Sequence, residues 1–150
     1  MKTVQGWLDE YGASHQNPIN KRIHWICVPL IMLSLIGLLH EIPVVADKVH
    51  WSYIFICFAC IYYLRLSIAM FIGMSIIGVL LVLGVLALEK YLSYPLWETS
   101  LIIFIVSWIG QFIGHKIEGK KPSFFQDIQF LLIGPLWLLS FVYNKIGIKY

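Results

Sequence analysis

The chain has 150 residues, of which 59% are hydrophobic and 13% are charged, and its formal net charge is +3. Soluble domains carry roughly 45–50% apolar and about 25% charged residues, so this composition excludes an ordinary soluble domain and indicates a protein embedded in lipid. A charge this small gives no indication of nucleic-acid binding. We expect residues 1–150 to form a single all-α integral membrane domain, a bundle of about five hydrophobic helices plus a short N-terminal interfacial helix.

The chain begins with a short amphipathic stretch. Residues 3–12, TVQGWLDEYG, can place an apolar side on the membrane interface. The polar segment YGASHQNPINKRIH follows at 11–24, and the first apolar run occupies 25–39. No apolar core of a cleavable signal peptide precedes this run, so we expect the run itself to direct membrane insertion.

A lone cation, Arg65, separates the second apolar run, 51–64, from the third, 66–88. A charged side chain at the bilayer centre costs about 2.5–3.5 kcal/mol. The two runs together are also too long for one crossing and suffice for two. We therefore interpret Arg65 as the tip of a tight helical hairpin whose turn lies at Leu64–Ser67.

Two further apolar runs, at 95–114 and 124–143, complete five predicted crossings. The last run contains Gly134 and Pro135, where we expect a kink. By this count the N-terminal side of the membrane receives seven lysines and arginines, and the opposite side, which includes the C-terminus, receives four. The positive-inside rule then predicts that the N-terminal side is cytoplasmic.

The crossing count also decides which histidines meet. Five crossings place His15, His24 and His115 together on the N-terminal side, and His40 and His50 on the other. The first three have polar neighbours in the sequence, whereas the last two do not. We expect the last two to be ordinary interface residues.

A second polar segment, WIGQFIGHKIEGKKPS at 108–123, surrounds the third of these histidines. Gln111, His115 and Glu118 fall at i, i+4 and i+7, which is one face of a helix. Neutral imidazole suits iron, zinc, copper and nickel, and carboxylates and amides commonly hold metal-bound histidines in place. The spacing leaves open whether the histidines form a metal centre or only anchor helices. Five histidines are too few for a membrane di-iron site, so a metal centre here would be mononuclear.

Two blocks of the sequence resemble a known family. The first is the pattern Y-x-x-x-H-x-N-P-x-N-x-x-x-H-x-x-x-x-P, formed by Tyr11, His15, Asn17, Pro18, Asn20, His24 and Pro29. The second is QFIGHKIEGKKPS, with Gln111, Gly114, His115, Glu118 and Pro122. Together they are similar to the signatures of the 2-hydroxy fatty acid dioxygenases, small membrane proteins of fatty acid α-oxidation that act in the breakdown of the sphingolipid base phytosphingosine to odd-chain acids.

This resemblance implies an Fe²⁺-dependent oxidoreductase that uses O₂ to shorten a 2-hydroxy long-chain fatty acid by one carbon, releasing CO₂. It implies that His15, His24 and His115 bind the iron. A non-helical turn containing Pro18 would then separate the first two ligands. The residues expected to support the ligands are Tyr11, Asn17 and Asn20. Those expected to act on the substrate are Gln111, Glu118 and Arg65, with Lys21 and Lys116 as further cations that could steer its carboxylate.

Two other functions remain compatible with the sequence. One is a haem protein for electron transfer with two axial histidines, and the other is a non-catalytic lipid-binding membrane protein. No dinucleotide or phosphate-binding motif is present. We expect a bacterial inner membrane rather than the endoplasmic reticulum, with the site on the cytoplasmic side. Whether the chain forms a homo-oligomer is left open.

Overall fold

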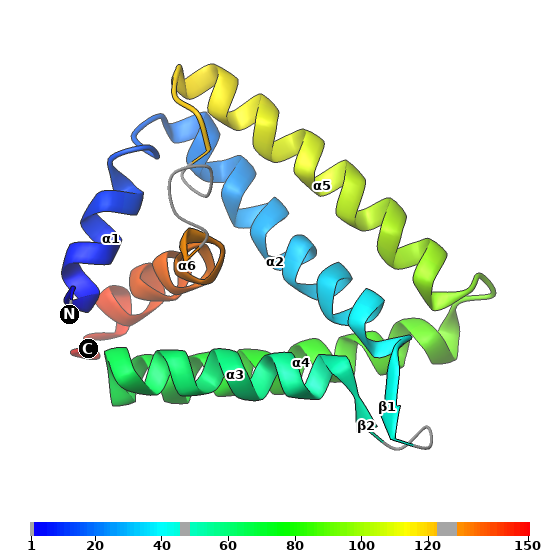
Figure 1. The fold of residues 1–150 in the computed structure, drawn as a ribbon. Coiled ribbons are helices and arrows are strands. Elements are labelled where there is room, and N and C mark those ends of the chain that lie inside the picture. Colours follow the sequence, from blue (N-terminus) through cyan, green and yellow to red (C-terminus); the bar gives the residue numbers. More distant parts are fainter. Residues whose placement is uncertain (1, 46–48, 123–128) are drawn as a thin grey trace.

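A computed structural model describes residues 2–45, 49–122 and 129–150 (Figure 1). The structure is an all-α helical bundle, as predicted, with a short antiparallel β-hairpin that was not predicted. In chain order the elements are α1 (Val4–Gly12), α2 (Pro18–His40), β1 (Pro43–Val45), β2 (Val49–His50), α3 (Trp51–Leu66), α4 (Ile68–Tyr91), α5 (Leu96–Glu118) and α6 (Phe130–Ile146). The first residues of the predicted fifth apolar run, 124–128, lie outside the described residues.

Helix α2 begins earlier than the apolar run that it contains. Pro18 occupies its first position, and the Asn17 side chain caps it by accepting a hydrogen bond of 2.9 Å from the Ile19 N–H. Proline is favoured there because its missing N–H has no helical partner anyway, and asparagine is a strong N-cap. The expectation that Pro18 lies in a non-helical turn between His15 and His24 was therefore wrong, because Pro18 already belongs to α2 and the non-helical segment is residues 13–17.

Helices α2 and α5 run antiparallel and pack closely, because small residues on α5 allow it (Figure 1). A Cβ atom on Gly110 would lie 2.7 Å from the Cys27 sulfur, and one on Gly114 would collide with the Asn20 amide oxygen. Small residues at such crossings bring helix backbones together. The close packing places the start of α2 beside the end of α5, so the two polar segments of the sequence meet.

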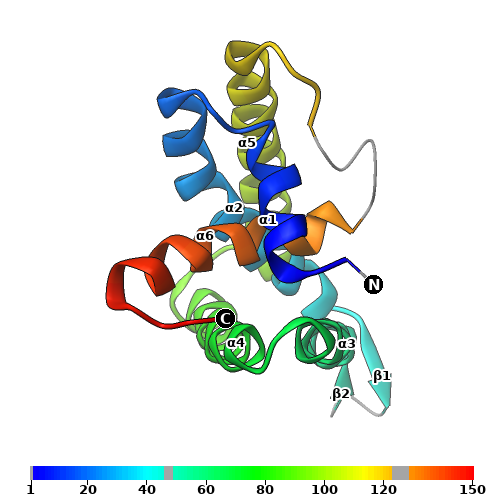
Figure 2. The same cartoon turned by 90° about the vertical axis from the view of Figure 1, so that its left-hand side faces the viewer.

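The predicted helical hairpin is confirmed, with α3 and α4 joined by the single extended residue Ser67. The Ser67 hydroxyl caps α4 by accepting from the Met70 N–H at 3.5 Å. Arg65 lies exposed in the last turn of α3, next to the connection. Figures 1 and 2 show the hairpin inclined to the α2–α5 pair, with α6 between its tip and the α1–α2 loop.

Helix α6 packs between α1 and the start of α4. The Tyr143 hydroxyl donates to the Ala69 carbonyl at 2.7 Å, and the Tyr63 hydroxyl donates to the Leu132 carbonyl at 2.9 Å. The C-terminus consequently lies near the N-terminus and the hairpin tip, away from the β-hairpin (Figure 1). The predicted crossings would place the C-terminus on the same side as residues 40–50, whereas the structure holds α6 against the start of α4, away from those residues.

Among the described residues, α2, α4 and α5 are long and apolar enough to cross a membrane, and α3 and α6 are shorter apolar helices. The outer faces of the long helices are strongly apolar, which fits a lipid environment better than water. The exposed large side chains include Ile72, Ile76, Val79, Leu80 and Leu83 on α4, and Ile102, Ile105, Val106 and Ile109 on α5.

Candidate metal centre

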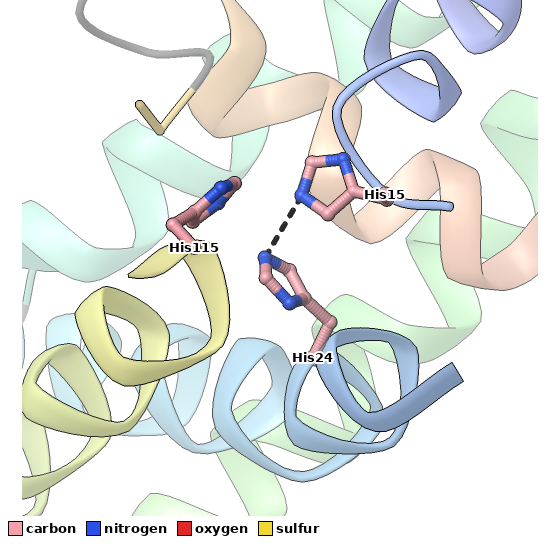
Figure 3. A group of neighbouring side chains, drawn as sticks. All are labelled: His15, His24 and His115. Carbon is pink, nitrogen blue, oxygen red and sulfur yellow. Dashed lines mark hydrogen bonds between the residues drawn. The ribbon is translucent and has the colours of Figure 1, made fainter. Parts of the chain in front are cut away.

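Three histidines from separate parts of the chain converge at the α2–α5 end of the bundle (Figure 3). His15 lies on the loop after α1, His24 in the second turn of α2, and His115 in the last turn of α5. None of the three side chains is more than 4% exposed. One ring nitrogen from each lies within 4.8 Å of the corresponding nitrogens of the other two. The structure thus brings together the three histidines that the sequence proposed as ligands.

Backbone carbonyls fix the orientation of two of these rings. His15 Nδ1 lies 2.6 Å from the Tyr11 carbonyl, and His24 Nδ1 lies 2.9 Å from the Asn20 carbonyl. A carbonyl oxygen only accepts, so each Nδ1 carries the ring proton and each neutral Nε2 presents a bare lone pair. The two Nε2 atoms nevertheless face each other at 2.9 Å. Two lone pairs in this arrangement repel unless a cation lies between them.

The surroundings of His15 keep its ring neutral. Burial, reinforced by repulsion from His24, lowers the pKa of His15 to about 3. The ring stacks on Tyr11 with centroids 4.1 Å apart and planes inclined by 12°, and the Trp137 ring lies 5.3 Å away. The neutral imidazole is the form that binds metals, so this ring is a ligand at ordinary pH without first losing a proton.

The third histidine contributes an unsatisfied nitrogen. His115 Nδ1 is buried and has no hydrogen-bond partner within the described parts of the chain. Buried polar atoms without a partner are rare in native structures and call for a ligand, an ion or a water molecule. Together with the opposed lone pairs, this atom shows that the cluster fits a metal ion better than it fits a network of hydrogen bonds.

Glu118 fastens the end of α5 to the loop that carries His15. Its carboxylate accepts from the backbone N–H groups of Gln16 and Asn17, each at 2.8 Å, and from the Asn20 amide at 3.0 Å. These donors form the N-terminal end of α2, where a helix favours a negative charge. The carboxylate is therefore fully engaged in holding the ligand-bearing segments together.

A second contact joins the same two segments. Helix α5 ends at Gly119, which adopts a left-handed conformation at φ 73°, and the Lys120 N–H then bonds back to the His115 carbonyl at 3.2 Å. The Lys120 ammonium donates to the Ala13 carbonyl at 2.6 Å, at the end of α1. No sequence pattern indicated this contact, because it depends on where the helix ends meet.

The other residues expected to act on the substrate lie in different places. Gln111 is buried one helical turn before His115 and, with Tyr11, lines a small cavity of about 60 Å³ beside the triad. Arg65 is not part of this cluster, since α6 lies between the end of α3 and the triad (Figures 1 and 2). The sequence missed Trp137, whose place against His15 follows from the packing of α6 and not from any local pattern.

The remaining two histidines form a separate pair near the β-hairpin. Their rings stack with centroids 4.0 Å apart, His40 Nδ1 lies 3.1 Å from the Ser52 hydroxyl, and His50 Nδ1 donates to the His40 carbonyl. Among the described residues, only the triad brings at least three potential ligands together. The pair therefore helps to join the end of α2 to the start of α3.

Comparison with known proteins points to the same family that the two sequence blocks resemble. The family model described as "Mpo1-like: 2-hydroxy-palmitic acid dioxygenase Mpo1-like" matches residues 1–146. The chain is 30% identical over 149 residues to the 2-hydroxy-palmitic acid dioxygenase MPO1 of Saccharomyces cerevisiae, and the match covers 96% of this chain and 82% of the yeast protein. No solved structure matches.

Proposed function

Because the chain belongs to the Mpo1-like family of 2-hydroxy-palmitic acid dioxygenases, we propose that it oxidises 2-hydroxy fatty acids with O₂, using an iron(II) ion held by His15, His24 and His115. The reaction RCH(OH)COOH + O₂ → RCOOH + CO₂ + H₂O is balanced without an additional reductant. The observation that carries the proposal is the pair of bare Nε2 atoms facing each other at 2.9 Å beside an unpartnered His115 nitrogen.

The donor set of the cluster fits iron. Metal-bound histidines usually donate their other N–H to a carbonyl or carboxylate, which is the arrangement of His15 and His24 here. Nitrogen ligands at ~2.1 Å from a metal and at right angles lie roughly 3 Å apart, close to the separation of the two Nε2 atoms. When bound, Fe²⁺ supplies the redox chemistry with O₂, for which zinc is unsuited.

The protein's own residues would bind and orient the substrate. Three neutral imidazoles leave the charge of the ion uncompensated, which favours an anionic substrate. The Gln111 amide faces the small cavity beside His115 and can donate to the substrate's carboxylate or hydroxyl. Lys116, exposed next to His115 in sequence, can draw the carboxylate towards this end of the molecule. Arg65, exposed in the last turn of α3 at the hairpin tip, lies on the other side of α6 from the triad (Figure 1) and is not expected to contribute at this step.

The rival functions fit the geometry less well. Axial histidines of a haem lie on opposite faces of a porphyrin, but here a third imidazole occupies the space beside the first two, at ring distances of 4.9 and 5.0 Å. A lipid-binding protein without metal would leave the buried His115 nitrogen unsatisfied and the lone pairs of the His15 and His24 Nε2 atoms opposed, which is costly.

The proposal is tested on detergent-purified protein that is reconstituted anaerobically with Fe²⁺. O₂ uptake and CO₂ release are then measured with 2-hydroxypalmitic acid. We expect about one iron per chain and equal amounts of O₂ and CO₂. His115→Ala should lose iron and reduce turnover more than about a hundredfold, beyond the loss expected for a supporting residue.

His50→Ala is the matched control, because it removes a partly buried histidine at the other end of the molecule. It should retain the iron and most of the turnover. Equal losses in the two variants, or turnover by protein shown to be free of iron, would contradict the proposal.

A further inference from the structure

A large apolar cavity of about 650 Å³ lies between the α3–α4 hairpin and the other helices. Its volume is within the range of roughly 300–1,000 Å³ that small-molecule sites occupy. The walls come from α2, α3, α4, α5 and α6, and they include Ile36, Phe55, Ala59, Met74, Leu81 and Phe104. A cavity of this size with so few polar groups suits a long hydrocarbon chain.

The large cavity adjoins the small cavity beside the histidines. Five residues line both it and the small cavity that His115 and Gln111 line, namely Ile31, Met32, Trp108, Leu131 and Pro135. The small cavity is therefore the polar part beside the triad, and the large cavity next to it is apolar. This is the polarity of a fatty acid with its carboxyl end at the histidines.

The dimensions agree with a long chain. Ile36, at the far end of the cavity, follows His24 by twelve residues on α2, which is about 18 Å at 1.5 Å per residue. Half of a ~30 Å hydrocarbon core, the reach of one leaflet's acyl chains, is about 15 Å. Beyond this point Ile36, Phe55 and Leu81 belong to a hydrophobic cluster around Val85, which closes the end.

The cavity also has an edge towards the membrane. Phe58 on α3 and Leu131 on α6 line it and are 68% and 43% exposed. A chain dissolved in the bilayer can enter between these two helices without crossing water. This exposed edge gives a substrate that is dissolved in the bilayer a route into the cavity.

We propose that this cavity holds the acyl chain of the 2-hydroxy acid, and that Phe55 and Leu81 at its closed end set the chain length that the protein accepts. The inference rests on the proposed function for the identity of the head group. The acyl chain then lies along α2, between the α2–α5 pair and the α3–α4 hairpin, with its terminal methyl group against α3 and α4.

Substitutions at the closed end test the length limit. Leu81→Phe should shorten the cavity and lower kcat/KM for the longest accepted 2-hydroxy acid about tenfold or more relative to shorter ones, since one methylene in an apolar pocket is worth roughly 10–200-fold. Phe55→Ala should shift the preference towards longer acids. Leu83→Phe, the same change at a side chain that is 56% exposed on the outer face of α4, should leave the preference unchanged. An unchanged preference in both cavity variants would overturn the proposal.

A second experiment does not depend on turnover. A 2-hydroxy fatty acid with a photoreactive group at its terminal carbon is cross-linked to the purified protein, and the labelled peptides are identified by mass spectrometry. We expect labels on residues 51–66 and 68–91 at cavity-lining positions, removed by excess unlabelled 2-hydroxy acid but not by excess phospholipid. Removal by phospholipid alone would mean that the cavity holds bilayer lipid, and would overturn the inference.

The results distinguish a failure of the proposed reaction from a failure of the proposed acyl site. Labels at the cavity without O₂-dependent turnover would contradict the proposed reaction while supporting the acyl site. Turnover with labels only on the outer faces of α4 and α5 would support the reaction and contradict the acyl site.

Discussion

The carbonyls of Tyr11 and Asn20 decide which nitrogens of His15 and His24 face the proposed metal position. Main-chain atoms do this independently of the side chains at positions 11 and 20. The side chains have other tasks, since the Tyr11 ring stacks on His15 and the Asn20 amide donates to Glu118. The orientation of two ligands is therefore built into the fold of the α1–α2 segment.

The role of Glu118 can be tested by substitution, because its carboxylate accepts hydrogen bonds from three donors. In Glu118→Gln an N–H₂ group replaces one acceptor oxygen and faces a donor, so the loop carrying His15 should loosen. We expect iron affinity to fall about 10–100-fold, the range for residues that support metal ligands. Competition titration with a metal indicator measures this change.

Glu98→Gln is the matched control, because Glu98 lies in the first turn of the same helix, at the opposite end from the triad. It should leave iron affinity unchanged. If Glu118→Gln also bound iron normally, the carboxylate would have no part in holding the ligands.

At the scale of elements, the site depends on how closely α2 approaches α5. Gly110 and Gly114 allow the approach because Cys27 and Asn20 occupy the space of their absent side chains. One of these contacts is apolar and involves no proposed ligand, so it can be altered without touching the metal centre.

Gly110→Ala should destabilise the protein by about 1–3 kcal/mol, the usual cost of overpacking, because the new methyl group would lie 2.7 Å from the Cys27 sulfur. Adding Cys27→Ala to this variant should restore most of the stability, since it vacates that space. Thermal unfolding in detergent measures both changes. Adding Cys57→Ala instead, at an exposed cysteine, should not restore it, and equal effects of the two cysteine changes would refute the packing argument.

Local signals predicted the elements better than their arrangement. The α3–α4 hairpin followed from Arg65 between two apolar runs, and the face shared by Gln111, His115 and Glu118 followed from helical spacing. The start of α2 was placed too late because hydrophobicity was weighed above the Asn17–Pro18 helix-start signal. The β-hairpin was missed, since its two strands are very short.

At the scale of the whole molecule, the sequence proposed the triad but not the tertiary contacts around it. The family signatures and the predicted number of membrane crossings grouped the three histidines. The position of Trp137, the path of α6 and the bond from Lys120 to the Ala13 carbonyl depend on packing between distant segments. Arg65 was expected near the triad because the crossing count puts both on the same side of the membrane. That count says nothing about distance within the side, and α6 lies between them.

The arrangement of the chain ends gives a testable prediction of membrane sidedness. The N-terminus, the end of α5 and the C-terminus all lie away from the β-hairpin (Figure 1). In cells producing single-cysteine variants without Cys27, Cys57 and Cys60, a membrane-impermeant thiol reagent should label Val44→Cys from outside but neither Lys121→Cys nor Tyr150→Cys. After lysis, all three should be labelled.

Labelling of Lys121→Cys from outside would place the triad on the outer surface and reverse the predicted orientation. Labelling of Tyr150→Cys alone from outside would contradict the path of α6 along the start of α4.

The separation of the ligands along the chain affects how the protein matures. His15 and His24 leave the ribosome early, but His115 follows only after α3, α4 and most of α5 have been made. A nascent chain therefore offers an ion just two imidazoles, with Glu118 not yet there to fasten the loop that carries the first of them. Under the proposed function iron uptake is a late event in biogenesis, and we expect a truncated translation product that stops before α5 to bind no iron at this site.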